Sequence, residues 1–359
     1  MKQLIPVLVL ACSACSQGAT SSMKFGAAGP WKTEFGTMNK RGIELAVAEI
    51  NALPERQQRP LVVRYEDDDA SGEKASRIAQ SFVDSSDVLG VIGHVNSSPA
   101  VAAARIYDGH LAAVATSATS PELTGISKWT FRVSASDSTT GADMARFAMR
   151  RGRKRAAILY QNDTYGRGLV NAFRKAFTGT VVSVDPINNA ADQPFEPYVS
   201  FYKQQKPDVI FTAASDVAGR AFLREVRRQQ LDAELLGDGW SGLSSDPLAE
   251  GAFTGVPFTL ESPRAEVQAF VRAFKQKFGV VPYLNAALAY DATKLMYQAA
   301  VHGADRKQIR DYLSALDQAS AYQGVTGPIY FRPDGDPVGK TLVMTRFERG
   351  ALRVVEEAK

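Results

Sequence analysis

Residues 91–100 read "VIGHVNSSPA", and the change from apolar to polar within this stretch decides the fold class. A short apolar run ends at Gly93, and two serines and a proline then begin a predicted helix. Ser98 suits the N-cap and Pro99 suits the first helical position, where a missing N–H costs nothing. Helix capping alone explains the motif, although free amides beside a hydroxyl also form an anion site.

The same order of strand and then helix repeats on both sides of this stretch. "MKFGAAG" (23–29) precedes a helix over 41–53, in which Ile43, Ala46, Val47 and Ile50 are spaced i, i+3, i+4 and i+7. Such alternation implies βαβ units and parallel sheets with right-handed crossovers. We therefore predict an α/β protein of two Rossmann-like lobes with parallel central sheets. The strands expected in the second lobe are "AAILYQND" (156–163), "TVVSVD" (180–185) and "DVIFTAA" (208–214).

The end of the chain departs from this alternation. Two helical patterns, 265–279 and 285–303, follow each other with no strand between them, and strand-like "GPIYF" (327–331) and "TLVMTRF" (341–347) come next. This order predicts that the chain returns to cover the first lobe. The first break between the lobes is expected near "RVSASDSTTG" (132–141).

Composition restricts the class of partner. The chain has 359 residues, 45% of them hydrophobic and 22% charged, with a net charge of +4, as in an ordinary globular protein. So small a charge implies no nucleic-acid partner. The densest basic stretch, "RRGRKR" (150–155), lies where a helix should end, and cations favour helix C-termini. A solvated helix end is the favoured interpretation, and a polyanion contact is the alternative.

The N-terminus has the pattern of a secretory signal. Lys2 is followed by the apolar run 4–11 and then by small residues, and the run is too short to span a membrane. Both cysteines of the chain, Cys12 and Cys15, lie here, so no disulfide is expected elsewhere. A cysteine directly after an apolar run resembles the lipobox of bacterial lipoproteins, in which that cysteine is lipidated. We expect residues 1–15 to direct export to the periplasm or cell envelope, with a lipid anchor on Cys12 or Cys15.

The sequence offers little for catalysis. Its three histidines have no metal-ligand spacing, and neither a G-x-S-x-G elbow nor a P-loop is present. "GDGWSG" (237–242) satisfies G-x-G-x-x-G, but a dinucleotide site needs a helix after this loop. Pro247 and Gly251 interrupt the following segment, and Trp240 would crowd a pyrophosphate. The sequence therefore predicts a protein with no catalytic residues, no metal and no cofactor.

Ligands of open α/β sheets bind beyond the carboxyl ends of the strands. The loops expected there are rich in hydroxyl groups, aspartates and aromatic rings and have few basic groups, which suits a small zwitterion held between two lobes. They are 29–36, 93–98, 115–125 and 134–138 in the first lobe and at the crossover, and 161–168, 212–219 and 237–242 in the second.

The order of "FGAAGPWKTEFG", "YEDDDASGEKA", "VIGHVNSSPA", "FRVSASDSTTGADMARF", "ILYQNDTYGRGL" and "LNAALAYDATKLM" resembles type I periplasmic binding proteins, over about residues 23–355. The most similar branch is the Leu/Ile/Val-binding proteins of ABC transporters. The resemblance implies monomers without catalytic activity, whose two lobes, joined by a three-segment hinge, close on a ligand. They deliver it to an ABC permease in the inner membrane. The expected lobes are 22–137 with 265–338, and 138–264 with 339–357.

The resemblance also implies the roles of individual residues. Ser97, with Ser98 beside it, and Ser117 and Thr119 match positions whose hydroxyls and nearby amides hold a ligand carboxylate. The other positions carried over are Asp137 for the ligand ammonium, and Tyr165 and Trp31 as aromatic walls. Helix capping is the structural alternative for Ser98 and Asp137. A first-turn helix position is the alternative for Tyr165, and packing between the lobes is the alternative for Trp31.

Two positions depart from the Leu/Ile/Val-binding pattern. Ser215 and Asp216 stand where that branch has a tyrosine, and Gly239 stands where it has a second ammonium-binding glutamate. Asp238 is the candidate to replace that glutamate from the adjacent position. Trp240 and Ser215 are then expected to line a specificity pocket that need not suit leucine.

The resulting hypothesis is an exported solute-binding protein of an ABC importer, which binds an amino acid or an amino-acid-like compound between its lobes. The alternative is a ligand-sensing domain of the same fold for an amide, urea or carboxylate compound. The departures at Ser215 and Gly239 motivate that alternative.

Overall fold

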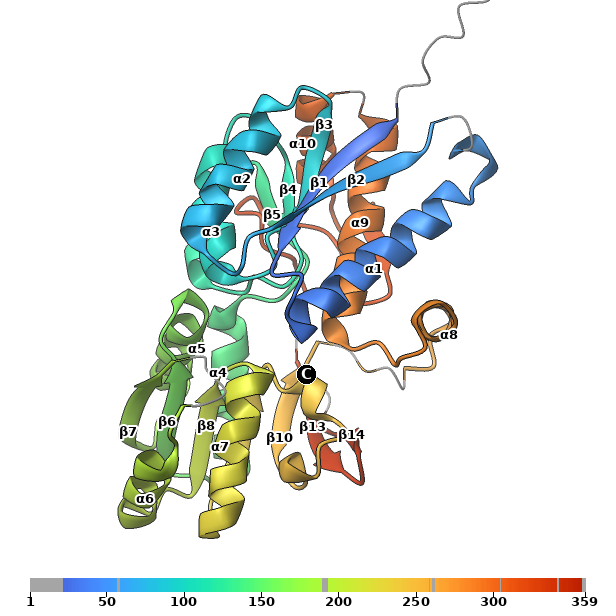
Figure 1. Cartoon of the computed structure of the whole chain (residues 1–359). Helices are drawn as coiled ribbons and strands as arrows, with labels where there is room; N and C mark the ends of the chain where they lie inside the picture. Colours follow the sequence, from blue (N-terminus) through green and yellow to red (C-terminus); the bar gives the residue numbers. More distant parts are fainter. Residues whose placement is uncertain are drawn as a thin grey trace, which may run out of the picture.

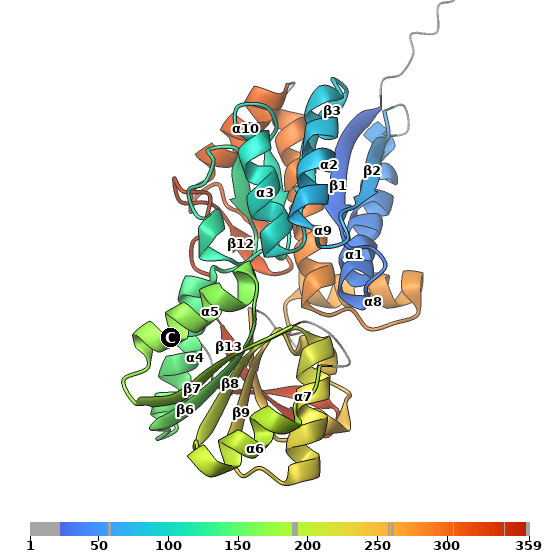
Figure 2. The same cartoon turned by 60° about the vertical axis from the view of Figure 1, so that its left-hand side comes forward.

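The computed structural model describes residues 22–356, apart from 57–58, 189–192, 258, 260–261, 304 and 341. The chain forms two α/β lobes, one above the other in Figures 1 and 2. This confirms the prediction of two Rossmann-like lobes with parallel central sheets. The predicted signal, with Cys12 and Cys15, lies outside the described residues.

The first lobe is built on a parallel sheet that is apolar on both faces. Its strand order is β2 (Leu61–Asp67), β1 (Met23–Gly29), β3 (Val88–Gly93), β4 (Ala113–Ala115) and β5 (Thr130–Arg132). One face packs against α1 (Glu34–Asn51), α9 (Leu284–His302) and α10 (Arg306–Ala315), and the other against α2 (Gly72–Asp84) and α3 (Ser97–Tyr107). Short 3₁₀ turns are η1 (Pro54–Arg56) and η2 (Pro121–Leu123).

The second lobe has a mixed sheet. Its order is β14 (Ala351–Glu356), β13 (Val343–Glu348), β10 (Phe253–Val256), β9 (Glu234–Asp238), β8 (Val209–Ala213), β6 (Arg155–Gln161) and β7 (Thr180–Ile187). The last five are parallel, and β13 and β14 add an antiparallel edge. One face carries α4 (Asp137–Arg150) and α5 (Thr164–Ala176), and the other α6 (Glu196–Gln205) and α7 (Asp216–Gln229). The loop after β9 continues in the 3₁₀ turns η3 (Ser241–Leu243) and η4 (Pro247–Ala249).

Within the described chain, three segments pass between the lobes. They lead from β5 to α4, from β10 to α8 (Ala265–Phe278), and from the hairpin of β11 (Tyr322–Gly324) and β12 (Gly327–Ile329) to β13. A buried ion pair connects the first crossing to the third, because Arg132 Nε donates to Asp336 Oδ1 at 2.6 Å. This arrangement brings the carboxyl ends of both parallel sheets to the junction of the lobes (Figures 1 and 2).

The helix after "VIGHV" starts two residues earlier than its sequence predicts. Asn96 is the N-cap and Ser97 the first helical residue, so Ser98 lies inside the first turn. The predicted capping role of Ser98 is therefore wrong. Its hydroxyl is instead used at the junction of the lobes.

Candidate ligand-binding site

The two lobes touch beside the hinge through short polar and apolar side chains. Ser98 Oγ in α3 donates a hydrogen bond to Thr164 Oγ1 at the start of α5, 3.1 Å away. A Cβ added to Gly168 in α5 would lie 2.5 Å from Cδ of Pro121 in η2, so glycine permits this close approach. The loops after β3, β4 and β6 therefore meet at one place.

Two of the predicted carboxylate-binding serines already have partners within the first lobe. Ser97 Oγ accepts hydrogen bonds from the amides of Thr119 and Ser120, both at 3.2 Å. Ser117 Oγ accepts from Asn39 Nδ2 at 3.0 Å. The Ser97 hydroxyl joins the N-terminus of α3 to the loop after β4, and the Ser117 hydroxyl joins that loop to α1.

Three polar groups at this junction are buried and have no hydrogen-bond partner among the described residues. They are Asn96 Oδ1, Thr119 Oγ1 and both carboxylate oxygens of Asp137. Buried polar groups in native proteins nearly always have a partner, because each unpaired group costs free energy. This set therefore indicates a place for hydrogen-bonding groups from outside the chain.

Asp137 is the most unusual of these residues, since it is 0% exposed. Burial raises its pKa well above the ordinary value, and the negative charge of Asp238 raises the pKa further. The Thr119 hydroxyl lowers the pKa to a lesser degree, although no hydrogen bond of good geometry forms between the two. A carboxyl group in this environment is stabilised by a positive charge brought to it.

Asp238 has a different environment at the end of β9. It accepts a hydrogen bond from the Tyr165 hydroxyl, with an oxygen–oxygen distance of 2.6 Å. Burial raises the pKa of Asp238 to about 6, and the hydrogen bond from Tyr165 opposes that rise. The structure thus brings together three residues named from the sequence, Asp137, Tyr165 and Asp238.

Asp216 and Ser215 begin α7 on the far side of the same junction. Ser215 is the N-cap residue, and Asp216 is the first helical residue. Asp216 Oδ1 and the Tyr283 hydroxyl are both buried without a partner in the described part of the chain. Burial raises the pKa of Asp216 to about 7, and the charge of Glu34 in α1 raises it further.

The two tryptophans have unlike environments. Trp31 is half-buried after β1, where its ring lies edge-on to Tyr65 with centroids 5.9 Å apart. Trp240 is 0% exposed and packs in the core of the second lobe. A Cβ on Gly237 would lie 2.0 Å from its indole. Trp240 thus packs in the core of the second lobe, while its indole Nε1 has no hydrogen-bond partner among the described residues, so its role as a pocket wall stays a prediction.

Three asparagines at the junction were not singled out from the sequence. Asn39 in α1 is 0% exposed and bonds both Ser117 and, through its Oδ1, the hydroxyl of Thr116. Asn285 Oδ1 accepts from Ser117 Oγ at 3.3 Å. Asn96 lies in the "NSS" motif itself. A buried asparagine on an otherwise apolar helix face was the available signal for Asn39.

The pattern that defines the periplasmic binding protein family matches residues 25–351. The chain belongs to this family. The binding protein is 27% identical to Leu/Ile/Val-binding protein homolog 2 of Brucella abortus, over 98% of this chain and 97% of the relative. It is 26% identical to the leucine-, isoleucine-, valine-, threonine- and alanine-binding protein of Pseudomonas aeruginosa, with the same coverage.

Solved structures agree with this assignment. An ABC transporter substrate-binding protein from Desulfitobacterium hafniense, in complex with Leu, is 29% identical and gives a TM-score of 0.79. The match covers 93% of this chain and all of that chain. The branched-chain amino acid transporter substrate-binding protein of Streptococcus pneumoniae, in complex with isoleucine, gives a TM-score of 0.85 at 23% identity, over 93% and 98% of the two chains. The fold of this binding protein is thus the type I periplasmic binding fold.

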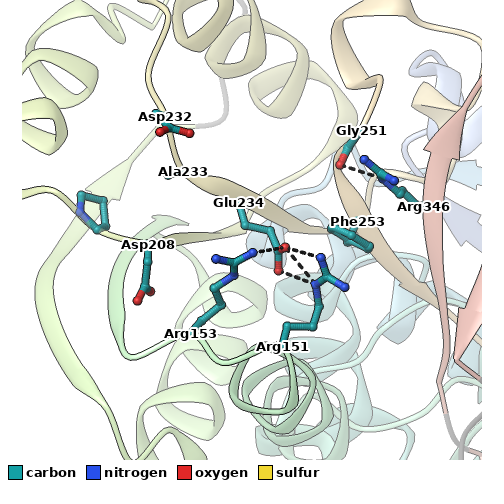
Figure 3. Close-up of a pocket in the computed structure, with 10 residues that line it drawn as sticks. Arg151, Arg153, Asp208, Asp232, Ala233, Glu234, Gly251, Phe253 and Arg346 are labelled. Carbon is teal, nitrogen blue, oxygen red and sulfur yellow. Dashed lines mark hydrogen bonds and ion pairs between the residues drawn. The ribbon is translucent and has the colours of Figure 1, made fainter.

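A separate pocket of about 480 Å³ lies at the amino ends of β6, β8 and β9, and Figure 3 shows its lining residues. Arg151 and Arg153 line it, and both form ion pairs with Glu234. Asp208 accepts hydrogen bonds from the amides of Lys154 and Arg155. Two of the five basic side chains in the stretch 150–155, those of Arg151 and Arg153, are thus paired with Glu234. The lobe junction remains the candidate ligand site of the binding protein.

Two further observations concern the described residues alone. None of their groups of His, Cys, Asp or Glu side chains is arranged to hold a metal ion. None of their helices is both long and apolar enough to cross a bilayer.

Proposed function

We propose that this protein is the solute-binding component of an ABC importer and that it binds an amino acid or an amino-acid-like compound between its lobes. The single observation that carries the proposal is the Asp137 carboxyl group, which is 0% exposed and without a partner for either oxygen among the described residues. An ionised carboxylate in such a place needs a cation, and an α-ammonium group is a small cation that donates several hydrogen bonds.

The ligand carboxylate has a complementary place in this proposal. Thr119 offers an unpartnered hydroxyl, and the N-terminus of α3 at Ser97 offers backbone amides and the positive end of a helix dipole. Ser97 and Ser117 shape this place through their bonds within the first lobe. Ser98 acts indirectly, by fixing α3 against α5.

The ammonium group then lies between Asp137 and Asp238, with Tyr165 holding Asp238 in position. Trp31 contributes an aromatic wall from the first lobe. The side chain of the ligand extends toward Ser215 and Asp216, where the chain departs from the Leu/Ile/Val-binding pattern. The names of the two relatives support an amino acid as the ligand, because one names Leu, Ile and Val and the other names these three with threonine and alanine.

The proposal also covers the oligomeric state, the location and the transport partner of the protein. It acts as a monomer without catalytic activity, is exported, carries a lipid on Cys12 or Cys15, and passes its ligand to an inner-membrane permease. The lobes that close are 22–137 with 265–338, and 138–264 with 339–357. Labelling cells with a fatty acid tests the anchor, since replacing the lipidated cysteine, Cys12 or Cys15, by alanine removes the label and replacing the other does not.

A thermal-melt screen of the protein without residues 1–15 tests the ligand class. The panel contains the standard amino acids, simple amides, urea and aromatic carboxylates. A ligand that binds the folded state raises the melting temperature with its concentration relative to Kd. Shifts with amino acids support the proposal. Shifts only with compounds that lack an ammonium group contradict it and favour the ligand-sensing alternative.

A further inference from the structure

Asp137 and Asp238 place two carboxyl groups within electrostatic range of each other, Asp137 fully buried and Asp238 partly buried. After burial, the charge of Asp238 is the largest cause of the raised pKa of Asp137. Two such carboxylates without a cation between them repel each other, so one of them is favoured in its neutral form.

The charged groups around Asp137 do not supply the missing cation. The positive charge of Arg132 in β5 lowers the pKa of Asp137, but the Arg132 guanidinium is bound to Asp336 at the other side of the hinge. Asp163, the N-cap of α5, adds a further negative charge that raises the pKa of Asp137. The charges facing Asp137 are therefore acidic on balance.

The hydrogen bonds distinguish the two acids. Tyr165 donates its hydroxyl to Asp238 at 2.6 Å, and a donor of this kind favours the charged form of the acceptor. Asp137 has no such donor among the described residues, and it is also the more buried of the two. A proton shared by the pair is thus held on Asp137.

We infer that the ligand-free protein keeps Asp137 protonated and that an incoming α-ammonium group displaces this proton. On binding, the O–H bond of Asp137 breaks and the proton passes to the solvent. The ammonium group keeps its three hydrogens and donates them toward the Asp137 and Asp238 oxygens. Ligand uptake is then coupled to the release of about one proton. This inference rests on the proposed function, because it requires an ammonium-bearing ligand.

Isothermal titration calorimetry measures this coupling directly. L-leucine, or the amino acid with the largest shift in the melting screen, is titrated at about pH 6.5 in buffers that differ in ionisation enthalpy, and the slope gives the number of protons exchanged. We expect a net release of protons, up to about one per ligand. The affinity should rise by up to about tenfold per pH unit below the pKa of Asp137 and level off above it. Zero exchange or proton uptake would overturn the inference.

Variants assign the proton to a residue. Asp137→Asn should bind more weakly, exchange no proton and lose the pH dependence. Asp143→Asn, on the same helix, removes an acid that pairs with Arg146 near the surface and should release the proton as the wild type does. Circular dichroism and the melting temperature establish that each variant is folded.

A second variant keeps the inference testable if Asp137→Asn does not fold or bind. Asp238→Asn removes the neighbouring negative charge, so the pKa of Asp137 falls and the pH at which affinity levels off moves lower. An unchanged pH profile in Asp238→Asn contradicts the inference. If no amino acid binds the wild type, the proposed function fails with it. If an amino acid binds without proton exchange, only the proton coupling fails.

Discussion

The Tyr165 hydroxyl donates a hydrogen bond of 2.6 Å to Asp238 across the top of the second-lobe sheet. Tyr165 comes from the first turn of α5 and Asp238 from the end of β9, so this bond fixes the two elements at the lobe junction. It sets the position and the charge of an acid proposed to contact the ligand.

Replacing Tyr165 by Phe should weaken amino-acid binding by about tenfold, because a hydrogen bond to a charged group contributes about 1.5 kcal/mol or more. The ring is kept, so packing changes little. Calorimetry on the folded variant gives the affinity. A variant with wild-type affinity would remove this hydrogen bond from the binding mechanism.

The Ser98–Thr164 hydrogen bond joins the lobes directly, and Ser98→Ala removes it. We expect a loss of about 1 kcal/mol in the free energy that holds the lobes together, and therefore about fivefold weaker ligand binding with a more open ligand-free form. Small-angle scattering and ligand titration measure the two effects. Ser76→Ala in α2 is the matched control, since that hydroxyl bonds only within its own helix, to the Gly72 carbonyl. Equal effects of both variants would contradict a role for the lobe contact.

The two tryptophans should respond differently to truncation. Trp240→Ala removes a completely buried core side chain and should lower the free energy of unfolding by about 3–5 kcal/mol. Trp31→Ala should cost less stability and reduce affinity, because Trp31 is half-buried beside the proposed site. Urea unfolding and the melting screen measure these changes. A stable Trp240→Ala variant with an altered ligand preference would contradict a purely structural role and support Trp240 as a wall of the ligand pocket.

Asp216→Asn should stabilise the ligand-free protein at alkaline pH. Burial raises the pKa of Asp216 from 3.8 to about 7 in the folded state, so the unfolded state ionises first as the pH rises. The wild type therefore loses stability between about pH 4 and pH 7, and above pH 7 the loss is complete. The variant removes this cost and should gain about 1–3 kcal/mol at pH 8 and little at pH 4. An equal gain at both values in urea unfolding would contradict the argument.

Much of the fold follows from the sequence, since "VIGHVNSSPA" and its neighbours alternate apolar strands with amphipathic helices. The antiparallel edge of β13 and β14 was not predicted, because such a pairing depends on which distant strand is left unpaired. The start of α3 was misplaced by two residues, since Asn96, Ser97 and Ser98 all suit a cap by their chemistry.

Only part of the candidate site could be predicted from the sequence. Asp137, Tyr165 and Asp238 followed from the resemblance, and the structure groups them. The burial of Trp240 could not be predicted, because it depends on Gly219 and Gly237 leaving room for the indole within the second lobe. The hydrogen bonds of Ser117 with Asn39 and Asn285 join residues far apart in the chain, so no local sequence pattern predicts these bonds.

The three crossings between the lobes also affect how the chain can be made. The first-lobe sheet packs against α9 and α10, and the second-lobe sheet ends with β13 and β14, so both lobes need residues from beyond position 280. A growing polypeptide therefore cannot finish either lobe until most of it has been synthesised. Until that point it exposes sheet faces and edges that only its last quarter can cover.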